Sequence, residues 1–114
     1  MKSRLPAGYG GGGAGNQQQM MKKYQQMQEQ IEQTQSELDE TEFAQTSGGG
    51  ACKATVNGKK RVLSLEIDPD IIDRDDPETL SDLVISAINA AISKAEKTSE
   101  ERMSGITGEL GLGF

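Results

Sequence analysis

Few residues in this chain are suited to catalysis. The sequence contains no histidine, the most common general base, and its single cysteine, Cys52, has no such base to activate it. Cys52 alternates with Ala54 and Val56 in a short apolar run, which is more typical of a small buried side chain than of a nucleophile. The sequence therefore predicts a protein that is not an enzyme, needs no cofactor and takes no small-molecule substrate.

Two other patterns resemble ligand-binding motifs but lack their spacing. The acidic run 68–76 offers carboxylates to a cation, yet Ile72 and Asp73 stand where a calcium loop requires an oxygen ligand and a glycine. The glycines 48–50 are not followed by the Lys-Ser or Lys-Thr pair of a phosphate-binding loop. We therefore expect helix caps in the first segment, a tight turn in the second, and no metal site.

Basic residues are the remaining candidates, and their chemistry is phosphate binding. The chain has 12 Lys and Arg against 18 Asp and Glu, a net charge of −6, so contact with DNA requires a local basic patch. The charges are segregated along the sequence. Residues 1–28 and 51–65 each contain four bases and no acid, whereas most acids lie in 29–50 and 66–82.

A long amphipathic helix must position the first group of bases. Residues 1–15 are mostly glycine, and we expect them to form a flexible arm. From Asn16 onward, residues recur at alternating steps of four and three, which predicts a helix with one continuous seam made of Met20, Tyr24, Met27, Ile31, Thr34, Leu38 and Thr41. This seam would pack on a second helix or on another copy of the chain, or present adaptable methionines to a partner protein.

Alternating residues then predict a small antiparallel sheet. We expect strands over 41–47, 51–56 and 60–67, joined by the glycine turn and by Asn57-Gly58, a strong hairpin signal with a loop of two or four residues. Either loop gives the sheet one apolar face, formed by Cys52, Ala54 and Val56 together with Leu63, Leu65 and Ile67.

A second long helix follows the sheet. Asp76-Pro77 combines an N-cap residue with a first-turn proline, and the helix is expected to fade between Met103 and Gly105, which leaves 105–114 as a glycine-rich tail. Its apolar stripe runs over 80–95 and includes Leu80, Val84 and Ile88. With 33% hydrophobic residues, one chain is too small to cover both this stripe and the strand face.

These elements predict an α+β fold: a small antiparallel three-stranded sheet flanked by two long helices, homodimeric through the sheet. A single cysteine excludes an intrachain disulfide and suits a reducing compartment. The sequence contains neither a secretion signal nor an apolar run long enough to span a bilayer. We therefore expect a cytoplasmic protein with no membrane partner.

Two basic clusters are candidates for contact with DNA. If the helices run antiparallel from the sheet outward, five bases lie level with one another and form a helix tip, namely Lys22, Lys23, Lys94, Lys97 and Arg102. A second cluster is expected at the hairpin tip, namely Lys59, Lys60 and Arg61. The first cluster would be explained equally well by ordinary solvated lysines. The second would be explained equally well by protection of a sheet edge.

Three stretches in this order resemble the YbaB/EbfC family of nucleoid-associated proteins. The most specific is GGGACKATVNGKKRVLSLEIDPDII, and the others are DPETLSDLVISAINAAISKAEK and the Met- and Gln-rich MMKKYQQMQEQIEQTQSEL. The resemblance covers residues 16–108. It departs from the family at Thr107-Gly108-Glu109, where relatives have Thr-Gly-Gly followed by a terminus of the Pro-Gly-Phe type.

The resemblance implies that residues 16–104 form a DNA-binding dimer domain. Its sheets would pair across a two-fold axis, and its helices would project as arms that associate with double-stranded DNA without catalysis. We therefore expect a nucleoid-associated protein that binds DNA through phosphate contacts, with little sequence specificity. The alternative is a protein-binding adaptor or chaperone-like factor that uses the Met- and Gln-rich helix.

Overall fold

The computed structural model describes residues 4–109, and for residues 4–16 and 109 only the course of the backbone. The predicted α+β fold is confirmed, because the chain forms two long helices and an antiparallel sheet with strand order β1-β2-β3. The elements are α1 (Arg4–Glu40), β1 (Glu42–Ser47), β2 (Cys52–Asn57), β3 (Val62–Ile67) and α2 (Pro77–Glu109), with short 3-10 turns at Gly48–Gly50 and Pro69–Ile71.

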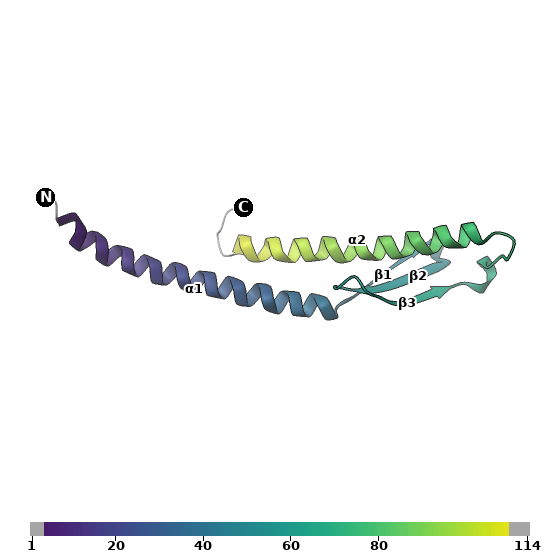
Figure 1. Ribbon diagram of the computed structural model, residues 1–114, viewed down its shortest axis with the longest axis horizontal. Coiled ribbons are helices and arrows are strands. Elements are labelled where there is room, and N and C mark those ends of the chain that lie inside the picture. The colour runs from purple at the N-terminus through teal and green to yellow at the C-terminus, as the bar shows by residue number, and fades with distance from the viewer. Residues whose placement is uncertain (1–3, 110–114) are drawn as a thin grey trace.

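α1 and the sheet lie end to end, so the molecule is elongated and measures 88 × 21 × 16 Å (Figure 1). β1 continues away from the end of α1, and the β2–β3 hairpin returns toward that end. α2 begins beyond the ends of the strands that lie farthest from α1. It then runs back over the sheet and only after that reaches the side of α1 (Figure 1). The two helices are therefore antiparallel, but they lie side by side only near the C-terminal end of α2.

Both helices are longer than the sequence predicts. α1 begins at Arg4, not near Asn16, so the part of the expected flexible arm within 4–15 is helical. α2 continues past Gly105 to Glu109. Glycine has a weak helix propensity, so the sequence alone does not predict a helix through these positions. Residues 1–3 of the expected arm and 110–114 of the expected tail lie outside the described residues.

The hairpin between β2 and β3 has the longer of the two expected loops. The Asn57 carboxamide oxygen accepts hydrogen bonds from the N–H groups of Lys59 (2.9 Å) and Arg61 (3.1 Å). Positive φ occurs at Lys60, not at Gly58. Gly58 instead lies against the C-terminal end of α1, where a Cβ atom would overlap the Leu38 carbonyl group. The glycine is therefore required for close approach, and the hairpin is docked on α1.

The core lies between α2 and the first two strands. Small side chains of α2 pack against β2, with Leu38 and Phe43 completing the cluster of Cys52, Ala54, Val56, Ala87, Ala91 and Ala95. Small residues on both elements allow the helix to approach the sheet closely. The prediction that Cys52 is a buried core residue is confirmed.

The apolar face of the sheet has the predicted residues, but α2 covers only part of it. Leu65 pairs with Ala54 and Ile67 with Cys52, so both lie on the face that α2 packs against. However, α2 packs on β1 and β2, and Leu63 and Leu65 on β3 remain 48% and 38% exposed. Three further residues predicted for the core or dimer contact are only half-buried, namely Leu80, Val84 and Ile88.

Two aspartates cap helical segments, as their positions before proline predict. Asp68 accepts a hydrogen bond from the N–H of Asp70 at 2.9 Å. The Asp76 carboxylate at the start of α2 accepts hydrogen bonds from the Thr79 hydroxyl (2.6 Å) and the Thr79 N–H (3.3 Å). These bonds, chiefly the one from the hydroxyl, lower the pKa of Asp76. The charged carboxylate therefore stabilises the folded state.

Replacing Asp76 with alanine is expected to lower the melting temperature at neutral pH because the cap is lost. Folding lowers the pKa of Asp76, so its contribution is present above the pKa of the unfolded carboxyl group and disappears as the pH falls through the lower folded value. Thermal unfolding followed by circular dichroism should therefore show a difference at neutral pH that shrinks as the pH falls through the folded pKa. Asp75→Ala is the control, since among the described residues its carboxylate accepts no hydrogen bond.

Candidate nucleic-acid interface

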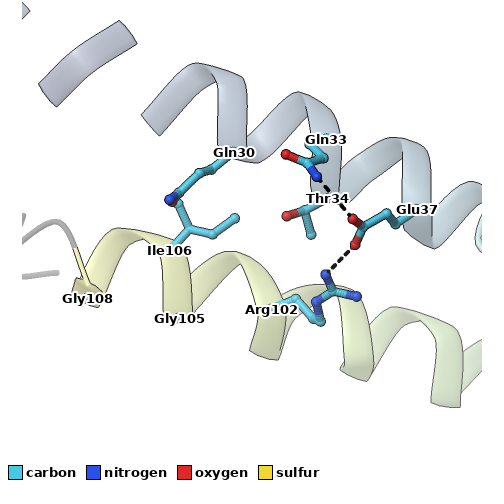
Figure 2. A pocket seen from close by; sticks show the side chains of 8 residues that line it. All are labelled: Gln30, Gln33, Thr34, Glu37, Arg102, Gly105, Ile106 and Gly108. Atoms are coloured by element: carbon cyan, nitrogen blue, oxygen red, sulfur yellow. Dashed lines mark hydrogen bonds and ion pairs between the residues drawn. The ribbon is translucent and has the colours of Figure 1, made fainter. Parts of the chain in front are cut away.

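The contact between α1 and α2 fixes how the two helices are aligned. The Arg102 guanidinium donates a hydrogen bond to the Glu37 carboxylate at 2.8 Å, and Gln33 donates to the same carboxylate at 3.4 Å (Figure 2). The bond from Arg102 is the main reason why the pKa of Glu37 is lowered. Beside it, Ile106 of α2 is buried and faces Thr34 and Gln30 of α1 (Figure 2). Arg102 is thus level with Glu37.

This alignment shows that the predicted helix tip does not form. Lys22 lies about 22 Å from the level of Glu37 along α1, and Lys97 lies about 7 Å from the level of Arg102 in the opposite direction. The expectation that these lysines are level assumed that α2 starts beside the end of α1. In the structure α2 first crosses the sheet (Figure 1), which separates Lys22 and Lys23 from Lys94 and Lys97 by about 30 Å.

Two of the predicted phosphate-binding residues already have acidic partners. Arg102 pairs with Glu37, and the Lys60 ammonium lies 3.0 Å from the Glu96 carboxylate of α2. No local pattern in the sequence indicates these pairs, because they join residues far apart along the chain. Both pairs are solvent-exposed, so their main effect is to lower the local positive charge.

The remaining bases of the sheet region are dispersed. Lys59 and Arg61 are exposed on the docked hairpin beside Lys60. Glu96 turns toward this hairpin, and Lys94, two positions earlier on α2, therefore projects from the opposite flank of the helix. The structure brings Lys59, Lys60 and Arg61 together as predicted, but it does not add Lys94 to them.

Acidic side chains surround the middle of the molecule. The stretch of α1 that lies beside α2 and the facing part of α2 contain Glu32, Glu37, Asp39, Glu40, Glu96, Glu100 and Glu101. A DNA duplex would be repelled from this part of the surface.

The N-terminal part of α1 has the opposite character. Residues 17–28, which we call the basic arm, include Lys22 and Lys23 and no acidic residue. Both lysines are exposed, and neither forms an ion pair within the part of the chain that the structure describes. α1 extends past the end of α2 here, so the basic arm is reachable from several sides (Figure 1).

The described residues form a slender α+β domain with a partly uncovered apolar strand and a projecting basic helix. Among the side chains of residues 17–108 no group of three or more cysteine and acidic residues is arranged to hold a metal ion. Neither described helix has an apolar stretch able to cross a membrane. The chain matches the profile of the YbaB/EbfC DNA-binding family over residues 13–110. It belongs to this family, which confirms the resemblance read from the sequence and agrees with a protein that is not an enzyme.

Individual relatives match nearly the whole chain. A nucleoid-associated protein of Thermoanaerobacter pseudethanolicus is 46% identical over 111 residues, covering 97% of this chain and 95% of the relative. A nucleoid-associated protein of Clostridium acetobutylicum is 43% identical over 105 residues, covering 92% and 94%. The crystal structure of an uncharacterized protein of Helicobacter pylori has the same fold, with a TM-score of 0.57 and 23% identity over 68% of this chain and 90% of that one.

Proposed function

We propose that this protein is a nucleoid-associated homodimer that binds double-stranded DNA through phosphate contacts of its basic arms, with little dependence on sequence. The observation that carries the proposal is the exposed Lys22-Lys23 pair on a helix that extends beyond the acidic middle of the molecule. Family membership and the names of the relatives support DNA as the ligand. They also favour DNA binding over the adaptor alternative.

Electrostatics explains why the contact is confined to the arms. The net charge of −6 repels DNA at long range, so binding depends on a surface where bases are separated from acids. The basic arm meets this condition because the first acidic residue of the chain is Glu29. Two lysines per chain provide few contacts, and the binding surface therefore needs a second copy.

An uncovered apolar surface supports a site for the proposed second copy. Ile85, Ile88 and Ile92 follow one another on α2 at steps of three and four residues, and the next step reaches Glu96, which bonds the hairpin. This flank of α2 therefore faces the side of β3, next to the exposed Leu63 and Leu65. β3 is also an unpaired edge strand, with free backbone donors and acceptors. Pairing with β3 of a second copy would satisfy the edge and cover these leucines.

A Leu65→Asp variant is expected to lose the dimer, because an unpaired charge buried between two apolar surfaces destabilises the contact by several kcal/mol. Sedimentation velocity at micromolar concentration measures the mass. Ser64→Asp is the matched control, since Ser64 pairs with Thr55 and points to the opposite face of the sheet. A Leu65→Asp protein that sediments as a dimer would show that the contact lies elsewhere.

Titration with salt tests the DNA-binding proposal itself. Fluorescence anisotropy on random duplex DNA should give an association constant that falls steeply with salt concentration and hardly changes with sequence. Four arm lysines in a dimer predict a slope of about −3 to −4 in a plot of log K against log salt. An absence of binding at low salt would contradict the proposal.

A further inference from the structure

An apolar patch on α1 has no partner within the described residues. Met20, Met21 and Tyr24 are 69%, 63% and 58% exposed, and they lie together beside Gln25 and Gln28. The Tyr24 hydroxyl accepts a hydrogen bond from the Gln28 side chain at 3.1 Å. We call these three apolar residues the methionine patch. Large apolar side chains grouped in this way on a surface usually mark a contact site.

The methionine patch continues the surface by which α1 packs in the fold. Along the seam, Leu38 and Thr34 are buried, Ile31 and Met27 are half-buried, and Tyr24 and Met20 are exposed. Exposure rises because α2 comes to its end. Among the described side chains Ile106 is the last buried one of α2, and it lies opposite Gln30 (Figure 2). The patch is thus the uncovered end of the α1–α2 contact.

The residues that follow α2 in sequence suit this surface. Residues 110–114 read Leu-Gly-Leu-Gly-Phe. From the level of Gln30, Tyr24 is about 9 Å and Met20 about 15 Å farther along α1, while five extended residues reach up to about 17 Å. In an extended segment the three apolar side chains would point to the same side, and the glycines between them would permit close approach.

We propose that residues 110–114 pack on the methionine patch of the same chain and so extend the α1–α2 contact by two further turns of α1. Leu110, Leu112 and Phe114 then cover Tyr24, Met21 and Met20. The contact supports α1 beyond the end of α2, next to Lys22 and Lys23. It does not depend on DNA binding.

Disulfide trapping tests the contact. In a Cys52→Ala background, Tyr24→Cys combined with Leu112→Cys should oxidise to an intrachain disulfide, giving a product of monomer mass on a non-reducing gel. The matched control pairs Leu112→Cys with Gln26→Cys, because Gln26 lies about 200° around the helix from Tyr24. The proposal requires the Tyr24–Leu112 cysteine pair to oxidise at least about fivefold faster than the Gln26–Leu112 control pair. Equal oxidation rates for the two pairs would overturn the proposal. A product mainly of dimer mass would also overturn it and would indicate that a second copy of the chain covers the patch.

Hydrogen exchange provides a test that needs no cysteine. Replacing Leu110, Leu112 and Phe114 with serine should speed amide exchange in the peptide 17–28 by about fivefold or more, because the helix there loses its packing. Exchange in the three strands should stay unchanged. Exchange of peptide 17–28 at the parent rate would overturn the proposal, because serine removes the apolar contact on which it depends.

Discussion

A Gly58→Ala variant is expected to unfold at much lower denaturant concentration than the parent protein. The added Cβ would overlap the Leu38 carbonyl and the Asp39 nitrogen, which are backbone atoms at the end of α1 and have no flexible side chain to move aside. Relieving the overlap separates the hairpin from α1 beside the buried Leu38. Overpacking of this kind costs about 2–3 kcal/mol, a large fraction of the 5–15 kcal/mol typical of a domain. Urea unfolding followed by circular dichroism measures the change.

Gly105→Ala is the matched control for this prediction. Gly105 lies in α2 with nothing within 4 Å of an added Cβ, so the same substitution meets no obstacle there. Because alanine favours helix over glycine, this variant should be about 0.5–1 kcal/mol more stable than the parent. If the two variants lose stability equally, the close approach of Gly58 to α1 is not what requires glycine.

A Lys22→Gln and Lys23→Gln double variant is expected to lose most DNA affinity. Each phosphate contact contributes roughly 0.9 to the salt slope, so removing two per protomer should flatten the slope of a dimer by about 3 to 4 units. The loss should be equal for all DNA sequences, since phosphate contacts do not distinguish bases. Anisotropy titrations over a range of salt concentrations measure both quantities.

Two variants with the same change in charge serve as controls for the basic arm. Lys94→Gln with Lys97→Gln, and Lys59→Gln with Arg61→Gln, remove two charges each from the sheet region and should weaken binding much less. All three variants should keep the mass and melting temperature of the parent, because the substituted side chains are exposed. If the hairpin variant loses binding while the arm variant retains it, the DNA contact belongs to the sheet.

Local signals in the sequence were enough to predict the elements of the fold. Strand alternation, the tight turn at glycines 48–50 and the two Asp-Pro caps each depend on a few neighbouring residues, and each is confirmed. The hairpin at Gly58 was predicted correctly, but not the reason for glycine there. Gly58 does not have a positive φ and is needed because it lies against Leu38, which is distant in sequence. Glycine is favoured both in turns and where two backbone segments approach closely, so its presence alone does not distinguish the two causes.

The position of the bases depended on information that the sequence does not contain. Six-residue strands span about 20 Å, and a helix needs about 13 residues to cross that distance. α2 therefore brings Lys94 only to the junction of sheet and helices, not to the end of α1. No helical periodicity reports this offset, because it depends on α2 starting at the far end of the three strands and packing back over the sheet. The partners of Lys60 and Arg102 were missed for the same reason.

Buried Ile106 faces Gln30 near the point where α1 extends past α2, so α1 acts as a lever that pivots close to this contact. Lys22 is about 12 Å farther along the helix, and a rotation of about 10° at the contact would displace it by about 2 Å. Small changes in helix packing are thus converted into displacements comparable to a hydrogen-bond length at the lysines. A pair of such levers could adjust its opening to the local width of a duplex while the sheet stays rigid.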